Sequence, residues 1–157
     1  MTGARIEQRA EDRDGWTPQG PVVELSADHS WTLLGQASFG RLAVSVDNQP
    51  AIFPLDYACD GHSILFRTSE GTKLRDLLRN NRVSFEADKR VQDESWSVIV
   101  EGTADILHDP SDIANADSAA LPEWVPTAPP VYVRISPTSI HGRRFVHSVL
   151  AQRSPAL

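Results

Sequence analysis

The stretch RLAVSVDNQPAIFPLDYACDGHSILFRT, residues Arg41–Thr68, alternates apolar and polar side chains in three short segments separated by turn residues. Alternation with a period of two is typical of strands that bury one face. Asp47-Asn48 and Asp60-Gly61 are pairs that favour tight hairpin turns. The stretch therefore predicts three consecutive antiparallel strands, at 41–46, 51–57 and 62–68.

The same alternation continues toward the carboxyl end of the chain. Four further strands are predicted, at 82–88, 95–107, 131–136 and 139–145. Gly102 suggests a bulge or a sharp bend within its strand. Pro54 has no N–H to donate to a ladder, so its strand is expected at a sheet edge or with a bulge there. Six or seven short strands at hairpin spacing favour a mainly β fold, a small antiparallel barrel with few helices.

Three segments carry helix signals. Ser26 is a candidate N-cap within a short helical segment at 24–38. Asp109-Pro110 opens a second segment that runs to about Asp117, because proline is favoured at the first helical position. Thr72 is a candidate N-cap for the third segment, in which Leu74, Leu77 and Leu78 would pack inward.

The third helix belongs to the basic stretch FRTSEGTKLRDLLRNNR, residues 66–82. Four arginines and one lysine against one glutamate and one aspartate give it a charge of 5 − 2 = +3, in a chain of net charge −6. Lys73 and Arg75 in a first helical turn oppose the helix dipole unless an anion lies there, and free amides at a helix start attract anions. The pattern predicts a phosphate site at Lys73, whereas Arg79 and Arg82 are expected on a solvated face. The phosphate-loop pattern of nucleotide hydrolases is absent.

Length and composition limit the class of protein. The chain has 157 residues, which fits one domain, expected at 21–148 between flexible tails at 1–20 and 149–157. An acidic pI of about 5.3 argues against a protein that coats nucleic acid. Cys59 is the single cysteine, so no internal disulfide can form. With no signal-peptide pattern and no long apolar run, we expect a soluble cytoplasmic protein without a membrane partner.

Few residues suggest catalysis by the protein itself. The five histidines are scattered and form no metal-binding spacing, so no metal is expected. No GxSxG elbow is present, and Cys59 has no paired base near it in sequence, so it is expected to fill space. Trp96 alternates with Val98, which fits a core position; a tryptophan at a strand start can also line a pocket.

The order and spacing of several motifs resemble the pyridoxamine 5′-phosphate oxidase-like family, the FMN-binding split barrels. The similar pieces are GRLAVSVDNQPAIFPLDYACDGHSILFRTSEGTKL, NNRVSFEAD and WSVIVEGTA, with a weaker similarity in ISPTSIHGRRF. The resemblance implies a split barrel that binds FMN, or alternatively a deazaflavin, at the interface of a homodimer.

The resemblance also implies which residues hold the cofactor. It places Pro54, Leu55 and Asp56 along the flavin ring system and ribityl chain. It places Arg67, Thr68 and Ser69 near the ring edge and ribityl hydroxyls. The remaining implied residues are Thr72 and Lys73 at the phosphate, Trp96 and Ser97 on a later strand, and Arg143 or Arg144 in a late segment, which in this family can come from the second subunit.

The chain also departs from the family pattern. Its late segment offers only HGRRF, with no tryptophan after Trp124, and its phosphate turn has one lysine where the oxidase has an arginine-lysine pair. These differences argue against oxidation of pyridoxamine phosphate itself. The expected function is a flavin-dependent oxidoreductase acting on a small molecule, with no catalytic residue assigned. The alternative is a non-catalytic split barrel that binds or senses a flavin, deazaflavin or haem.

Overall fold

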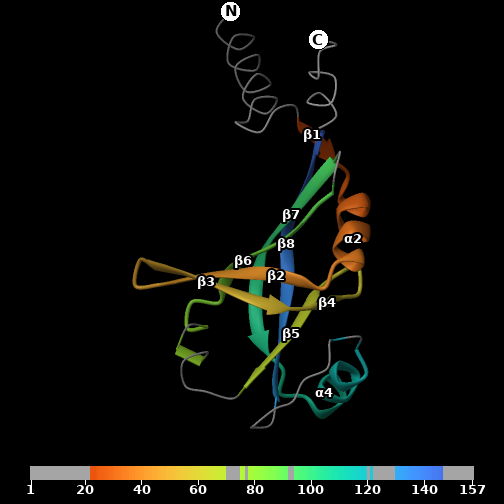
Figure 1. The fold of residues 1–157 in the computed structure, drawn as a ribbon. Helices are drawn as coiled ribbons and strands as arrows, with labels where there is room; N and C mark the ends of the chain where they lie inside the picture. Colours follow the sequence, from red (N-terminus) through yellow and green to blue (C-terminus); the bar gives the residue numbers. More distant parts are fainter. Residues whose placement is uncertain are drawn as a thin grey trace, which may run out of the picture.

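A computed structural model describes residues 22–69, 75–76, 78–91, 94–119, 121 and 130–146 (Figure 1). Within them lie eight strands and two helices longer than one turn. The strands are β1 (Val22–Leu25), β2 (Phe39–Val46), β3 (Gln49–Asp56), β4 (Ala58–Cys59), β5 (Ile64–Ser69), β6 (Arg82–Arg90), β7 (Glu94–Ile106) and β8 (Pro130–Val146); the helices are α2 (Ala27–Gln36) and α4 (Pro110–Asp117).

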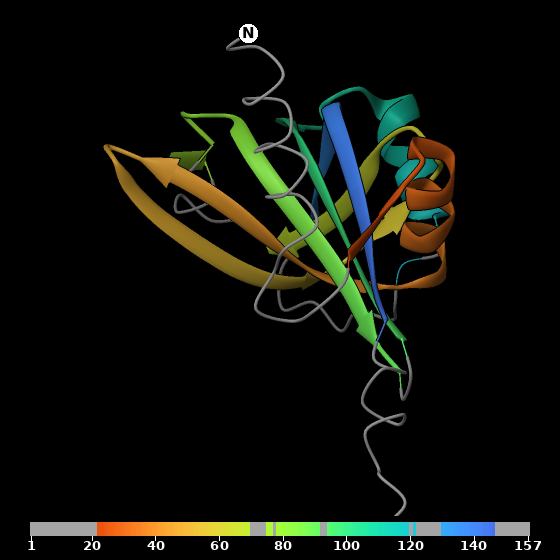
Figure 2. The ribbon, with the colours of Figure 1, turned by 90° about the horizontal axis from the view of Figure 1, so that it is seen from above.

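All eight strands form one antiparallel sheet in the order β3-β2-β6-β7-β8-β5-β4, with β1 added to the far end of β8. The sheet is strongly twisted, so β2 and β3 run across the long strands β7 and β8 (Figures 1 and 2). β3 is the terminal strand of this order, which confirms the edge position predicted from Pro54. The predicted fold class, a mainly antiparallel split barrel with few helices, is confirmed.

The barrel interior is filled by the apolar side chains that alternate along the strands. Phe85, Val98 and Val100 are fully buried where β6 pairs with β7. Tyr57 lies edge-on to Phe85, with ring centroids 4.8 Å apart, and its hydroxyl donates a hydrogen bond of 2.6 Å to the Leu34 carbonyl on α2. One aromatic side chain thus ties the helix to the sheet.

The amino-terminal segment contains more than the helix predicted at 24–38. Residues Val22–Leu25 form β1, in which Glu24 lies opposite Arg143 of β8. Ser26 is the N-cap, as predicted, and its hydroxyl accepts from the His29 amide at 3.2 Å. With only four residues, VVEL, β1 is too short for an alternating pattern to stand out, so the sequence does not predict it.

The two late strands predicted at 131–136 and 139–145 are one continuous strand, β8. Its pairing with β7 shifts register between Glu101 and Gly102, and Thr138 has no partner in the register, which confirms the bulge predicted at Gly102. A β-carbon at Gly102 would lie 2.1 Å from the Ser136 carbonyl oxygen, so only glycine fits there. Pro137 interrupts the alternation in the sequence, so the pattern predicts two strands. The strand nevertheless continues through Pro137, because a bulge tolerates proline where a regular ladder does not.

Helix α4 covers the sheet on the side opposite the barrel core. Asp109 caps it, accepting from the Ser111 amide at 2.8 Å, and Pro110 occupies its first turn, as predicted. Ala116 packs with Leu65 and Tyr132 in a second apolar cluster. Neither α2 nor α4, nor any other helix in the described ranges, is long and apolar enough to cross a membrane.

Candidate functional site

Strand registers place a defined set of side chains on the side of the sheet opposite the barrel core, here called the outer face. One row crosses four strands through the paired residues Pro54–Arg41, Arg41–Glu86 and Glu86–Ile99. A second row, parallel to it, contains Ile52, Ala43, Ser84 and Glu101. Because paired residues in antiparallel strands point to the same side, these side chains share one surface.

A three-charge cluster lies at the centre of the outer face. The Arg41 guanidinium lies 3.1 Å from the Asp88 carboxylate and 3.4 Å from that of Glu86. Burial, together with the hydrogen bond and charge of Asp88, raises the pKa of Glu86 to about 7, against the opposing effect of Arg41. With all three groups ionised, the cluster has a charge of −1; with Glu86 protonated it is neutral.

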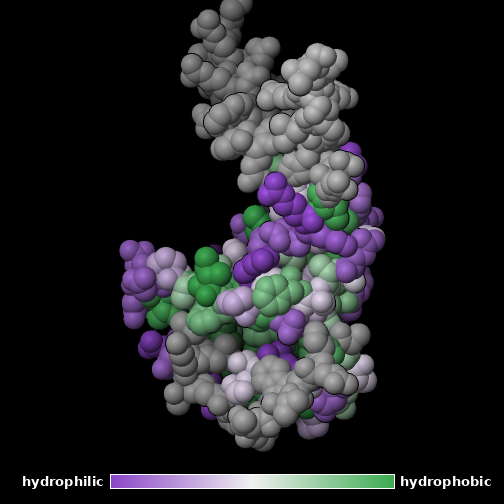
Figure 3. Space-filling model, in the orientation of Figure 1, coloured by the Kyte–Doolittle hydropathy of each residue, from purple (hydrophilic) through white to green (hydrophobic). Residues whose placement is uncertain are grey.

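Large apolar side chains surround this cluster. Ile52 is 68% exposed, Phe39 48% and Ile99 42%. Phe39 also lies under the Arg41 guanidinium, whose carbon is 5.6 Å from the ring centroid. Figure 3 shows hydrophobic surface over β2 and β3 next to strongly hydrophilic surface. The outer face therefore combines apolar side chains with charges of both signs.

The first group of predicted site residues gathers where the end of β3 meets β5. Pro54 and Asp56 are exposed on the outer face, whereas Leu55 points inward and packs against the core. After Asp56 the chain passes through Tyr57 to β4, which pairs with β5. This connection brings the carboxyl end of β3 beside β5, although the two strands are far apart in the sheet order.

On β5, the predicted residues differ in their surroundings. Arg67 is half-buried and pairs in register with Tyr132, whose hydroxyl donates a hydrogen bond to Asp117 of α4. Thr68 is half-buried and Ser69 is exposed at the end of the strand. Burial and the hydrogen bond to Asp117 raise the pKa of Tyr132, whereas Arg67 lowers it, so these three groups interact electrostatically.

The later predicted residues lie elsewhere in the sheet. Trp96 is only 7% exposed and belongs to the core, the position that the alternation alone indicates. Ser97 is half-buried and faces the opposite way, onto the outer face, with Arg143 as its β8 partner. Arg143 pairs with Glu24 at 3.3 Å. Arg144 lies 3.5 Å from Glu94, an ion pair in which its Nε makes no hydrogen bond.

Arg67 and Ser97 are far apart along β8 within one protomer. Ser97 pairs with Arg143 and Arg67 pairs with Tyr132, and those two β8 residues are 143 − 132 = 11 positions apart. At a rise of about 3.3 Å per residue, they are separated by roughly 35 Å along the strand. Figure 1 shows β8 running nearly straight along the length of the sheet. A single small molecule cannot touch both ends in one copy of the chain.

Thr72 and Lys73, the residues predicted to bind a phosphate, lie outside the described residues. Beyond them, Arg75 and Asp76 are helical and exposed, and Leu78 packs against the core. Arg79, expected on a solvated face, is exposed, and its guanidinium donates to the Asp76 carbonyl at 3.2 Å. Arg82, expected there too, is also exposed at the start of β6.

The residues at the β3–β5 junction fit a flavin. An edge strand such as β3 leaves backbone donors and acceptors without a ladder partner on one side. The pyrimidine edge of a flavin ring also carries both donors and acceptors, and the hydroxyls of Thr68 and Ser69 suit a polyol chain. The junction thus offers the hydrogen-bonding groups that a ring edge and a ribityl chain require.

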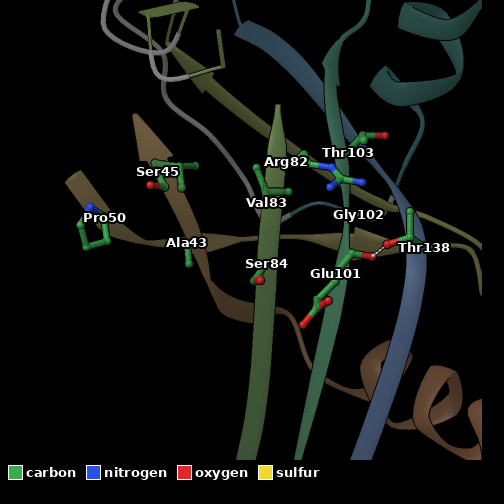
Figure 4. Close-up of a pocket in the computed structure, with 11 residues that line it drawn as sticks. Ala43, Ser45, Pro50, Arg82, Val83, Ser84, Glu101, Gly102, Thr103 and Thr138 are labelled. Atoms are coloured by element: carbon green, nitrogen blue, oxygen red, sulfur yellow. Dashed lines mark hydrogen bonds between the residues drawn. The ribbon is translucent and has the colours of Figure 1, made fainter. Parts of the chain in front are cut away.

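A groove of about 500 Å³ lies elsewhere on the sheet and contains none of the predicted site residues (Figure 4). Hydroxyl side chains supply much of its lining, which also includes one basic and one acidic side chain. The lining includes Ser45, Ser84, Thr103, Thr138, Arg82 and Glu101. Thr138 donates to the Glu101 carbonyl at 3.1 Å across the bulge. The sequence contained the alternation that turns these residues outward, but the register that brings them together is visible only in the structure.

Cys59 behaves as the filler that the sequence predicted. It is half-buried and packs against the core, and burial raises the pKa of its thiol, which keeps it protonated and weakly nucleophilic. Among the residues that the structure describes, no group of three histidine, cysteine or acidic side chains is placed to hold a metal ion.

Comparisons with known proteins give the same family. The family model of pyridoxamine 5′-phosphate oxidase matches residues 26–144, about three quarters of the chain. The uncharacterised protein Rv0080 of Mycobacterium tuberculosis is 30% identical over 132 residues, which cover 80% of this chain and 86% of that protein.

Two solved structures share the fold along nearly their whole length. The FAD-binding protein of Mycobacterium smegmatis has 44% sequence identity and a TM-score of 0.73, covering 79% of this chain and 98% of that one. A FAD-binding protein of Mesorhizobium loti has 29% identity and a TM-score of 0.68, covering 78% and 97% of the respective chains.

Proposed function

The chain belongs to the pyridoxamine 5′-phosphate oxidase family, and from this premise we propose that it is a flavin-dependent oxidoreductase that acts on a small molecule. The observation that carries the proposal is its 44% identity to a FAD-binding protein over 98% of that protein's length. A bound flavin would supply hydride and electron transfer, and the protein would position the ring and set its electrostatic surroundings.

We further propose that the β3–β5 junction holds the flavin. Pro54, Leu55 and Asp56 would border the ring along the free edge of β3, and Arg67, Thr68 and Ser69 would contact the ring edge and ribityl hydroxyls. Lys73, with Thr72, would bind the first phosphate. FMN is the cofactor that the sequence resemblance implies, and the two similar solved structures are of FAD-binding proteins. Both cofactors contain the ring, ribityl chain and first phosphate to which these residues are assigned.

The separation between Ser97 and Arg67 supports a cofactor shared between two copies of the chain. If both residues contact one flavin, Ser97 must belong to the second protomer, because in its own protomer it lies at the opposite end of β8. Arg143, the β8 partner of Ser97, would then approach the same flavin from that protomer. A homodimer with two equivalent sites meets this requirement.

Identification of the copurifying small molecule tests the cofactor. Purified protein should show flavin absorbance, and mass spectrometry of the molecule released on denaturation should give FMN or FAD. Release of a deazaflavin or a haem would mean that the protein uses the chemistry of that cofactor instead. A colourless protein that takes up none of these molecules would contradict the proposal. Reduction of the bound flavin by NADH or NADPH, followed by reoxidation with an acceptor, would support catalysis over sensing.

Lys73→Ala tests the phosphate contact. Loss of a charge-assisted hydrogen bond should weaken flavin affinity by about 1.5–3 kcal/mol, measured by titration of the apoprotein with flavin. Arg79→Ala is the matched control, since Arg79 is exposed and its guanidinium is held by the Asp76 carbonyl. Unchanged affinity in Lys73→Ala would mean that the phosphate binds elsewhere, and a large loss in Arg79→Ala would mean that the outward side of the helix binds it.

A further inference from the structure

Arg67 lies between the end of β3 and the strand that α4 packs against. On one side β5 pairs with β4, where Leu65 lies opposite Ala58. Asp56, at the end of β3, and Arg67 each lie two residues beyond that pair. On the other side β5 pairs with β8, where Arg67 lies opposite Tyr132. Arg67 therefore connects the proposed place of the flavin ring to β8 and its covering helix.

Tyr132 is almost completely buried, and its hydroxyl has polar partners on two elements. The residue is 4% exposed and packs with Leu65 and with Ala116 of α4. Its hydroxyl donates a hydrogen bond to the Asp117 carboxylate, and a phenolic oxygen can accept a hydrogen bond as well. Burial and Asp117 raise the pKa of Tyr132, whereas a hydrogen bond from Arg67 opposes them. Three side chains thus connect α4 through β8 to β5.

Asp117 occupies an unfavourable position in α4. It is the last residue of the helix, where the carbonyl groups carry a partial negative charge, and the last turn contains no basic residue. A carboxylate at this end opposes the helix dipole, so the stability of α4 does not account for it. The hydrogen bond from Tyr132 and the charge of Arg67 compensate this placement.

We propose that Tyr132, anchored by Asp117, is a positioning residue that holds the Arg67 guanidinium toward the flavin ring. The inference rests on the proposed function for the flavin and adds two residues that the family resemblance does not imply. Reduction adds electron density to the ring, so a cation held beside it favours the reduced form.

The chemistry of arginine explains why a buried tyrosine is useful here. A guanidinium carries five N–H donors in a rigid fork, at the end of a side chain with many rotamers. One hydrogen bond to a fixed hydroxyl restricts those rotamers and leaves the remaining donors for a ligand. Tyr132 is fixed in turn by its apolar neighbours and by Asp117.

The midpoint potential of the bound flavin tests this role in the full chain loaded with FMN. Arg67→Gln should weaken binding of reduced relative to oxidised flavin about tenfold, which lowers a two-electron potential by about 30 mV. Tyr132→Phe keeps the ring in its apolar cluster and should lower the same ratio about threefold, or by about 15 mV. In the Arg67→Gln background, Tyr132→Phe should cause no further shift. A further shift there would show that Tyr132 acts without Arg67 and would overturn the proposal.

Two variants of Asp117 test the anchor. Asp117→Asn and Asp117→Ala both remove the carboxylate charge, but only the asparagine amide keeps an oxygen that can accept from Tyr132. Asp117 is exposed, so both variants should fold, with the circular dichroism spectrum of the wild type. Asp117→Ala should have the lower potential of the two, by about the Tyr132→Phe shift. Equal potentials would overturn the role of Asp117.

Asp112→Asn is the matched control for a loosened helix. Asp112 of α4 lies 4.0 Å from Arg134 of β8, so the variant weakens another contact between the same helix and strand. The potential should stay at the wild-type value. A shift as large as that of Tyr132→Phe would mean that poorer packing of α4, and not release of Arg67, changes the potential.

The loading step separates this role from the proposed function. A wild-type protein that takes up neither FMN nor FAD would contradict both. A loaded wild-type protein whose potential is unchanged by Tyr132→Phe would leave the proposed function intact and overturn the positioning role.

Discussion

The two faces of the β6–β7 ladder contain neighbouring residues of the same strands but have opposite compositions. Phe85 and Val100 are paired and fully buried, while the adjacent pair, Glu86 and Ile99, points outward. The buried rows of the inner face, from Val83 to Ala87 on β6, are apolar, so this side of the sheet stabilises the fold. The outer face combines an arginine, carboxylates and exposed isoleucines, a mixture that contributes little to folding. The difference indicates that the residues that stabilise the fold are concentrated on one side of the sheet, which leaves the composition of the other side free for other roles.

A pair of alanine variants provides the strongest test of this division. Phe85→Ala should lower the free energy of unfolding by about 3–5 kcal/mol, because it opens a cavity in the core and removes the ring that Tyr57 contacts. Ile99→Ala, on the next row and opposite face, should change it by less than about 0.5–1 kcal/mol. Urea titration followed by tryptophan fluorescence measures both; similar losses would show that the outer face also stabilises the monomer.

Tyr57→Phe tests a smaller effect within the inner side. The substitution keeps the aromatic contact and removes the hydroxyl that donates to the Leu34 carbonyl at 2.6 Å. A buried carbonyl without a donor should cost about 1–3 kcal/mol of unfolding free energy, with α2 loosened. Hydrogen exchange should be faster in α2 than in β7; uniform acceleration across both would argue that Tyr57 stabilises the whole barrel and not one contact.

Glu86→Gln tests a residue of the outer face and should have the smallest effect on the free energy of unfolding. Because the folded-state pKa of Glu86 is raised to about 7, from an ordinary value of 4.5, the folded protein holds more protons than the unfolded chain between these values. The contribution of Glu86 to the free energy of unfolding is therefore greatest at low pH and falls as the pH rises from about 4.5 to 7. The fall should be on the order of 1 kcal/mol after solvent screening.

Urea titrations of the wild type and of Glu86→Gln at pH 5 and pH 7.5 check this slope, at protein concentrations low enough to keep both monomeric. The variant should lose the part of the decline that is due to Glu86. Identical slopes would place the titrating group elsewhere in the molecule.

Much of the fold could be predicted from local pattern. Alternation placed Leu42, Phe85, Val98 and Val100 in the core, and turn chemistry identified the hairpin at Asp47-Asn48, where both residues have positive φ, at 51° and 61°. The pattern failed at β1, which has only four residues and is too short to show alternation, and at Pro137, where a bulge keeps β8 continuous. Both depend on pairing between distant segments, which periodicity does not reveal.

The candidate site was less accessible to sequence reasoning. Family resemblance implies Asp56, Arg67 and Ser97 as site residues, but it does not show that Ser97 lies at the other end of β8 from Arg67. The Arg41–Glu86–Asp88 cluster was missed because residues 41 and 86 have no sequence relation; only the β2–β6 register makes them neighbours. The sequence alone does not show the register in which the strands pair. This register determines which polar side chains share a surface.

The pairing of β1 with the end of β8 has a consequence for protein engineering. Val22 and Phe145 face each other on adjacent strands, about 5 Å apart, so the first and last described strands finish at one end of the sheet. A short linker could join them, and new chain ends could open at the Asp47-Asn48 turn without cutting any strand. Such a circular permutant would move a fused reporter from that end of the sheet to the tip of the β2–β3 hairpin, while the paired strands retain their neighbours.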